Sequence, residues 1–250
     1  MLEVKNLSCG YNGKDIVKDM SFSAADGEIL SITGPNGCGK TTLMRALSGI
    51  IPYHSGTAVI NGVEIASLDR LSLSRRIALL SQHGAGGEYA DFTVFDTVML
   101  GRYARLKGSI SKADKEMTEY CLERTGTADL RNEFISRLSG GQLQRVFLAR
   151  AFAQEPDIIL LDEPANHLDL RHRLKLIEML REWAGDRRSV IGIFHDLSLA
   201  AALSDRIMLM NEGKNILCGT PSEVCRSSEL SKVYGFDVAG FMRESQKMWL

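Results

Sequence analysis

Apolar and polar positions alternate with a period of two along the first part of the chain. Leu2, Val4 and Leu7 alternate with polar residues, and similar runs occupy 16–22 and 58–65, the last around an Asn-Gly pair. A period of two is typical of strands with one buried face, and Asn-Gly favours a two-residue hairpin turn. The pattern therefore predicts a small antiparallel β region at the N-terminus.

The second half of the chain alternates short apolar runs with longer helical patterns. Strand-like runs at 157–161, 190–194 and 206–210 are separated by helical patterns at 170–184 and 197–203. This alternation is typical of a parallel sheet covered by helices. One apolar stripe of the first helix is expected to be buried. It consists of Leu170, Leu174, Ile177, Leu180 and Ala184.

Between these two regions the sequence changes character. A strand expected at 28–33 runs into a glycine-rich loop and a helical pattern from residue 42, and another buried strand is expected at 77–80. Helical patterns then follow at 94–103 and 112–124. The predicted organisation is a single domain, 1–250, in which a helical subdomain, 84–153, is inserted into a core that includes the β subdomain, 1–83 and 154–250.

Composition and charge exclude several classes of protein. The 250 residues are 44% apolar, which is ample for a buried core. Thirty Lys and Arg face 31 Asp and Glu, so no global positive field favours nucleic acid, and no nucleic-acid partner is expected. Five cysteines without metal-finger spacing indicate reduced thiols. The longest apolar runs are far shorter than the ~20 residues of a membrane span, so any membrane role is expected to depend on a partner protein.

The loop after the strand at 28–33 has the pattern of a phosphate-binding loop. Glycine lets backbone N–H groups converge on phosphate oxygens at the positive end of the following helix. Lys40 is expected to reach the β- and γ-phosphates, and Thr41 to offer a hydroxyl to Mg²⁺. The alternative is a glycine turn without a ligand. The predicted ATP-binding loop comprises Gly34, Pro35, Asn36, Gly37, Cys38, Gly39, Lys40, Thr41 and Thr42.

An acidic pair follows the apolar strand at 157–161. Asp162 and Glu163 are expected at the carboxyl edge of the sheet, where nucleotides bind in open α/β folds. Asp162 is expected to hold Mg²⁺, directly or through water, and Glu163 to orient or deprotonate the water that attacks the γ-phosphate. The alternative is a pair of carboxylates that only caps the strand before Pro164.

A second anion-binding turn is expected at Ser139, Gly140, Gly141 and Gln142, at the start of another helical pattern. One nucleotide hardly needs two such turns from one small domain. The simplest explanation is that this turn closes on a nucleotide bound to another subunit, so a homodimer is expected. The alternative is an ordinary helix cap.

Three further residues occupy positions that suit nucleotide chemistry. Gln82 follows the strand at 77–80 and is expected near the metal and the attacking water, while His195 follows the strand at 190–194 and is expected near a phosphate oxygen. Tyr11 lies in a glycine-flanked turn and is a candidate for stacking on adenine. Each can also be structural.

Together these motifs resemble the nucleotide-binding subunits of ATP-binding-cassette (ABC) transporters, over all but about the last 25 residues. The resemblance implies an α/β fold, with a P-loop NTPase (RecA-like) core, an N-terminal antiparallel β subdomain and an inserted α-helical subdomain. It implies an ATPase that uses Mg²⁺. By the same resemblance, the adenine-stacking aromatic is Tyr11, the Walker A loop is 34–42, and Gln82 is both the Q-loop residue and a metal ligand. The resemblance also implies that the signature is 138–142 and that Walker B ends at Asp162 before the catalytic Glu163. The D-loop then holds Asp169, and the switch histidine is His195.

A finer likeness is to the importers of ferric siderophores, haem and cobalamin. It is carried by Leu100-Gly101-Arg102-Tyr103 and by the run 138–170. It implies two ATPase subunits at the cytoplasmic face of the membrane, bound peripherally through the region 83–105 to two integral-membrane permeases, which an extracytoplasmic substrate-binding protein supplies.

The sequence departs from that family at several positions. Ala165 stands where Thr is usual, Ser81 and His83 flank Gln82 where a preceding Pro is common, and Cys38 replaces a usual Ser. None of these changes removes a catalytic group.

Two other functions remain open at this point. A soluble ABC ATPase of iron–sulfur cluster assembly has the same motifs and similar length but no permease partner. An ABC ATPase acting on DNA or in translation usually has a long coiled-coil insertion or two cassettes, and neither pattern is present here.

Overall fold

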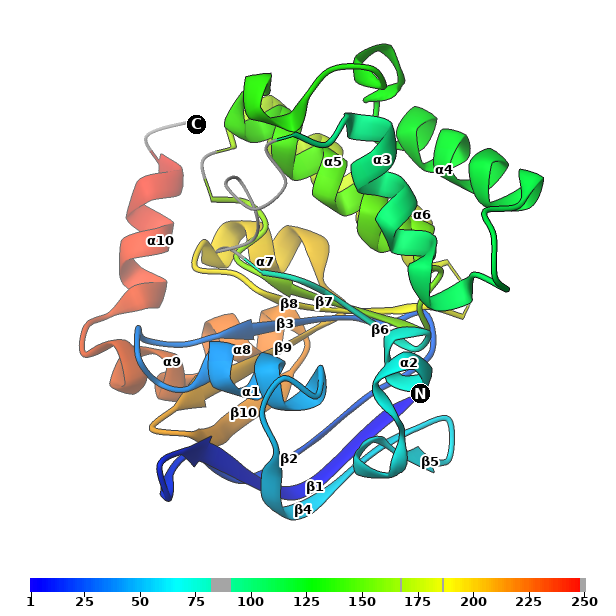
Figure 1. Ribbon diagram of the computed structural model, residues 1–250. Helices are drawn as coiled ribbons and strands as arrows, with labels where there is room; N and C mark the ends of the chain where they lie inside the picture. The colour runs from blue at the N-terminus through cyan, green and yellow to red at the C-terminus, as the bar shows by residue number, and fades with distance from the viewer. Residues whose placement is uncertain (82–90, 167, 186, 248–250) are drawn as a thin grey trace.

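The computed structural model describes residues 1–81, 91–166, 168–185 and 187–247, and these form two sheets with helices around them (Figure 1). A four-stranded antiparallel sheet has the order β2-β1-β4-β5, and a six-stranded sheet has the order β10-β9-β3-β8-β7-β6. The α/β fold class predicted from the sequence is confirmed. The strands are β1 (Leu2–Tyr11), β2 (Lys14–Ala24), β3 (Ile29–Thr33), β4 (Tyr53–Ile60), β5 (Val63–Glu64), β6 (Ile77–Leu80), β7 (Ile158–Asp162), β8 (Ser189–Ile193), β9 (Arg206–Asn211) and β10 (Lys214–Gly219).

The helices lie on both sides of the six-stranded sheet. In Figure 1, α1 lies between the two sheets, whereas α3 to α7 lie above the larger one. The α-helices are α1 (Lys40–Leu47), α2 (Arg70–Ser74), α3 (Val94–Met99), α4 (Lys112–Arg124), α5 (Gly140–Ala153), α6 (Leu170–Ala184), α7 (Leu197–Leu203), α8 (Pro221–Arg226), α9 (Ser228–Tyr234) and α10 (Val238–Lys247); short 3₁₀ helices include η2 (Leu100–Arg105).

The small sheet forms where the period-two pattern predicted it. The predicted hairpin turn between β4 and β5 is present, with both Asn61 and Gly62 in the left-handed conformation, at φ 49° and 80°. That turn twists in the same sense as the strands it joins, which is why Asn-Gly is favoured there.

The central strands of the large sheet are buried on both faces. Every residue of β3, β7 and β8 is buried, as expected for parallel strands covered by helices. Ile158 and Leu160 of β7 pack into one apolar core with α1 and the small sheet, while Ile159 and Leu161 pack into the other with α5, α6 and α7. The carboxyl end of β7 is thereby held between two packed apolar layers.

The region predicted to be a helix at 94–103 is α-helical only to Met99 and continues as η2. Contacts with the end of α5 explain the change. A Cβ on Gly101 would lie 2.2 Å from the carbonyl oxygen of Arg150, and buried Arg102 donates to the Ala153 carbonyl at 2.7 Å and to Asp114 at 3.1 Å. These contacts join η2 to both α4 and α5.

The prediction for the buried stripe of α6 was wrong in its first half. Leu170 and Leu174 are 74% and 55% exposed. The helix packs on the core only along its C-terminal half, where Trp183 stacks on Phe152 of α5 with ring centroids 4.4 Å apart. The buried residues of α6 are Leu176, Met179, Leu180, Trp183 and Ala184.

Beyond β9, the structure adds elements that the sequence patterns did not predict. These are the antiparallel edge strand β10 and the three helices α8, α9 and α10. Within the described parts of the chain, no helix is long and apolar enough to cross a membrane.

Candidate functional site

The glycine-rich loop connects β3 to α1 and requires glycine at several positions. Gly34, Gly37 and Gly39 have φ values of 148°, 77° and 106°, which side chains disfavour. A Cβ on Gly34 would also lie 2.0 Å from the carbonyl oxygen of Met210 in β9. The backbone N–H groups of the loop therefore lie next to the N-terminus of α1, where the helix dipole favours an anion.

Lys40 is the first residue of α1 and is almost fully buried at the loop. Its Nζ donates to the carbonyl oxygens of Gly34, at 2.8 Å, and of Pro35, at 2.9 Å. The ammonium group is thus held at the mouth of the loop by its own backbone. Cys38 is buried beside it, and burial raises the pKa of its thiol, so the side chain remains a neutral part of the loop wall.

Thr41 and Asp162 are 121 residues apart in the sequence but meet at the sheet edge. The Thr41 hydroxyl donates to Asp162 Oδ1 at 3.3 Å. Asp162 ends β7 and is buried, and this burial, together with the neighbouring charge of Glu163, raises the pKa of its carboxyl group. A hydroxyl oxygen and a desolvated carboxylate next to a phosphate loop form a donor set that suits a hard divalent cation.

Glu163 lies one residue beyond β7 in a left-handed conformation, at φ 56°, which is uncommon for a residue with a side chain. One carboxylate oxygen is hydrogen-bonded to His195 Nε2 and the other to Asn166 Nδ2. The sequence predicted His195 near a phosphate oxygen, and the structure places its ring nitrogen against Glu163 at the same edge. Asn166 was not predicted as a site residue; its position three residues after Glu163 was the available signal.

Part of the phosphate loop, Glu163 and His195 line one open cleft of about 640 Å³. Its wall includes Ile16 of β2, so the small sheet closes one side. From the described residues, the predicted ATP-binding loop and the pair Glu163 and His195 come together here. The loop residues in the wall are Asn36, Gly37, Gly39, Lys40, Thr41 and Thr42.

Tyr11 lies at the hairpin between β1 and β2, at the end nearest α1. Its hydroxyl accepts a hydrogen bond from Arg45 of α1 at 3.2 Å, and its ring is partly exposed to solvent. An exposed aromatic face beside the helix of the phosphate loop is available for stacking, and its adenine role stays a prediction.

The turn at Ser139 is arranged as the N-terminal cap of α5. Ser139 Oγ accepts from Gln142 N at 3.3 Å, and Gln142 Oε1 accepts from Ser139 N at 2.9 Å. Both Ser139 and Gly140 are exposed. Among the described residues that line the 640 Å³ cleft, none belongs to 138–142. The cap is therefore formed within the chain, while its outer surface is open.

Gly140 instead lines a second cleft, of about 260 Å³, which is also lined by Asp162 and Glu163. Ser81 also lines it. Gln82, predicted to approach the metal, directly follows Ser81 and lies outside the described residues.

Asp169 is the N-cap of α6. Its carboxylate accepts from His172 N at 2.9 Å and from the imidazole Nδ1 at 2.7 Å, and the bond from the His172 backbone lowers its pKa. The residue is exposed at the beginning of the helix. Its predicted D-loop role stays a prediction.

Comparison with known proteins agrees with this geometry. The family model described as ABC transporter matches residues 17–166. The petrobactin import ATP-binding protein YclP of Bacillus subtilis (strain 168) is 32% identical over 239 residues, which cover 95% of this chain and 94% of that protein. The hemin import ATP-binding protein HmuV of Chelativorans sp. (strain BNC1) is 34% identical over 241 residues, covering 94% and 91%.

A solved structure supports the same assignment. A dimeric ATP-binding cassette in a post-hydrolysis state, bound to ADP and Pi, matches with a TM-score of 0.78 at 25% identity and covers 88% of this chain and 99% of that chain. Because the family match includes both the phosphate loop and the acidic pair, and relatives align over nearly the whole chain, this chain is an ATPase of the ABC transporter family.

Proposed function

We propose that two copies of this chain enclose two ATP molecules and that hydrolysis lets the copies separate, which drives an import permease. Each ATP lies between the phosphate loop of one copy and the exposed Ser139-Gly140-Gly141 turn of the other. The observation that carries the proposal is the separation of these two anion-binding turns: the turn at 138–142 contributes nothing to the described wall of the phosphate-loop cleft. The dimeric ADP-bound cassette that matches this fold supports the assembly.

In the proposed reaction, Lys40 leaves its two backbone carbonyls for the β- and γ-phosphate oxygens. Glu163 takes a proton from the attacking water as the water oxygen bonds to the γ-phosphorus and the bond to the β–γ bridging oxygen breaks. His195 and Asn166 hold the two carboxylate oxygens of Glu163 and so fix its direction. ADP and inorganic phosphate are the products.

Thr41 and Asp162 fit a Mg²⁺ site, with Gln82 as a further ligand. When bound, the ion neutralises charge on the phosphates. A small number of protein oxygens suits such a site, because Mg²⁺ in nucleotide sites keeps several waters and is also bound by substrate phosphates.

We expect Asp162→Asn to leave the nucleotide-free protein at least as stable as wild type at about pH 7, and to abolish stabilisation by Mg²⁺–ATP. Burial raises the pKa of Asp162 above its ordinary value of 3.8. Between these two pKa values the folded state binds more protons than the unfolded state, so stability falls as the pH rises through that window. Asparagine has no such charge to desolvate, and it can still accept the Thr41 hydroxyl.

Thermal unfolding in EDTA, across about pH 4 to about pH 8, and again with Mg²⁺–ATP, measures both effects. Asp69→Asn is the matched control, because the pKa of Asp69 is shifted downward whereas that of Asp162 is shifted upward. The Ser72 backbone and hydroxyl lower the pKa of Asp69, so that substitution should cost stability at neutral pH without changing the response to nucleotide. An Asp162→Asn protein clearly less stable than wild type in EDTA at neutral pH would contradict the expectation.

The arrangement in trans has a direct test in mixed dimers. On a Glu163→Gln background, one protomer carries Lys40→Ala and the other Ser139→Arg. If each site is built from both copies, the mixed dimer has one site with both changes and one site with neither, so it should retain one radiolabelled ATP. If each site lies within one copy, both sites are damaged and no ATP is retained. Homodimers of either variant are the controls, and both should retain none.

The permease contact is proposed for the region 83–105, of which 91–105 is described. A cleft of about 400 Å³ opens there between η2, β6 and α5. Its lining includes Leu79 and Phe147 together with Arg150 and Gln154, and Tyr103, which also lines it, is 72% exposed. Through η2, which is bonded to the end of α5, movement of this surface reaches the helix that begins with the Ser139 turn. The proposed location is therefore the cytoplasmic face of the membrane, bound through the permease.

The proposed cargo is an iron chelate, such as a siderophore or haem, or cobalamin, delivered by an extracytoplasmic binding protein. The names of the petrobactin and hemin import relatives support this class. Uptake of labelled ferric siderophore, haem and cobalamin, in cells with and without the chain, tests it. Loss of one cargo, restored by wild type but not by Glu163→Gln, and co-purification of a polytopic membrane protein are expected. Normal uptake of all three, with a soluble scaffold protein in place of a permease, would contradict it.

A further inference from the structure

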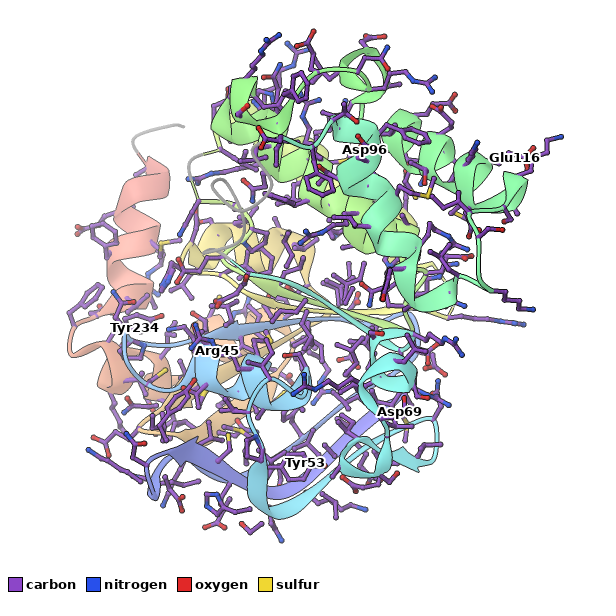
Figure 2. The ribbon with its side chains drawn as sticks, viewed as in Figure 1. Arg45, Tyr53, Asp69, Asp96, Glu116 and Tyr234 are labelled. Atoms are coloured by element: carbon purple, nitrogen blue, oxygen red, sulfur yellow. The ribbon has the colours of Figure 1, made fainter. Side chains whose placement is uncertain are left out.

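The C-terminal helices reach the beginning of the phosphate loop. Tyr234 is the last residue of α9, and its hydroxyl lies 3.0 Å from the Thr33 hydroxyl, at hydrogen-bond distance. Thr33 is fully buried, ends β3 and directly precedes Gly34. In Figure 2, Tyr234 is labelled at the left of the molecule, at about the same height as Arg45 of α1. A residue 201 positions away thus touches the loop entry.

The phenol is partly buried beside the start of the loop. Burial raises the pKa of Tyr234, and its hydrogen bond with the Thr33 side chain acts in the opposite direction. The Gly34 carbonyl in turn accepts from Lys40 Nζ at 2.8 Å. Because Thr33 and Gly34 are adjacent in the chain, Tyr234 is connected to the lysine of the phosphate loop through the Thr33 hydroxyl and the backbone of these two residues.

Gly34 has little freedom to move away from this contact. A Cβ at this position would lie 2.0 Å from the Met210 carbonyl oxygen and 3.1 Å from the Cys38 sulfur. The backbone at Gly34 is therefore packed against β9 and against the loop, and Tyr234 of α9 holds the preceding residue, Thr33. A peptide held by several separate elements keeps the loop in one conformation before nucleotide arrives.

The helix that carries Tyr234 is itself firmly placed. Leu230 of α9 and Val238 of α10 are buried in the large apolar core, and the Ser231 hydroxyl accepts from Val238 N at 3.2 Å. The Tyr234 ring packs edge-on against Phe236, with centroids 6.5 Å apart. Tyr234 is therefore positioned by neighbours buried in the core, and its partner Thr33 is itself fully buried.

We propose that Tyr234 is a positioning residue for the phosphate loop, so that the C-terminal segment 221–247 belongs to the nucleotide site. The proposal rests on the assignment of 34–42 to the ATP phosphates. Tyr234 acts through Thr33 and Gly34 and touches no phosphate. Without its hydroxyl, the peptide at Gly34 gains freedom that nucleotide must remove on binding, and this weakens affinity. Once nucleotide is bound the loop is ordered by the phosphates, so the chemical step is little affected.

Tyr234→Phe keeps the ring and removes the hydroxyl. Its KM for ATP and its calorimetric Kd for ADP should rise about five-fold, the effect of one lost hydrogen bond, with kcat within about two-fold of wild type. Tyr120→Phe is the matched control: this tyrosine is exposed on α4, within the described helices, away from the loop. Its nucleotide affinity should equal that of wild type.

Changes at Thr33 test the contact from the other side. Thr33→Val removes the partner hydroxyl and should also raise the KM for ATP, whereas Thr33→Ser keeps a hydroxyl and should retain wild-type affinity. The double variant Thr33→Val, Tyr234→Phe should have the same KM as Tyr234→Phe alone, because both single changes remove the same interaction. If Tyr234→Phe lowers the melting temperature without changing KM or Kd, the residue is only structural and the proposal is overturned. If wild type itself does not bind ATP or ADP, the assignment of the loop fails instead. Should Tyr234→Phe prove too unstable to measure, Thr33→Val carries the same expectation.

Discussion

Replacing Glu163 with glutamine is expected to lower kcat for ATP hydrolysis about a thousand-fold, while ATP affinity stays within about three-fold of wild type. The substitution keeps the shape of the side chain and removes the group that accepts a proton from water. Its backbone conformation should persist, because the residue is fixed by its position at the end of β7 and by Asn166 and His195. Steady-state phosphate release and calorimetric ATP binding measure the two quantities.

A matched control is present in the turn between β9 and β10. Glu212 is also a glutamate in the left-handed conformation, at φ 47°, but it is exposed and lies outside the described wall of the cleft. Glu212→Gln should hydrolyse ATP at the wild-type rate. Loss of activity in both variants would mean that strain at a left-handed residue, and not proton transfer, explains the effect of Glu163→Gln.

The same Glu163→Gln variant should accumulate as an ATP-bound dimer. If ATP holds the two copies together and hydrolysis releases them, a variant that binds but hardly hydrolyses keeps them associated. Light scattering with ATP and with ADP measures the change in mass, and ADP should leave the variant monomeric. A persistent ATP-bound monomer would refute the proposed clamp while leaving the ATPase chemistry intact.

The second large effect is expected for Lys40→Ala, which should reduce kcat/KM for ATP about 100-fold to 1,000-fold. The Lys40 ammonium group lies at the mouth of the loop and donates to two loop carbonyls. Removing it takes away charge that stabilises the transferring phosphate and also loosens the loop. Rates measured from low to saturating ATP separate the loss of affinity from the loss of turnover.

Lys18→Ala provides the control for this change, because Lys18 is an exposed lysine on the small sheet. Its kinetics should match those of wild type, which would exclude a general effect of removing a positive charge. Unchanged hydrolysis by Lys40→Ala would refute the role assigned to this residue.

Local chemistry explains why much of the site was predictable from the sequence. The loop at 34–42 needs glycine at positions of positive φ between a strand and a helix, and that requirement is visible in the residues themselves. The predicted bounds of α6 and α7, at 170–184 and 197–203, agree with the structure, because each helix begins at an aspartate cap and continues with a clear helical pattern. The fold class followed from the same alternation of elements.

Contacts between distant segments could not be predicted in the same way. The first half of the stripe assigned to α6 was wrong, because helical periodicity gives the spacing of apolar residues but not how far the core extends along the helix. His195 meets Glu163 across 32 residues of sequence, and this contact depends on β7 and β8 being neighbours in the sheet.

The sequence alone therefore determined the kind of chemistry: a phosphate loop, an acidic pair at a strand end and a capped helix, each specified by neighbouring residues. Only the tertiary structure decided which distant groups meet: Thr41 with Asp162, Glu163 with His195, and Tyr234 with Thr33 at the loop entry. The physical reason is that backbone conformation depends on near neighbours. The direction and partner of a side chain at a sheet edge depend instead on how elements far apart in the chain pack together.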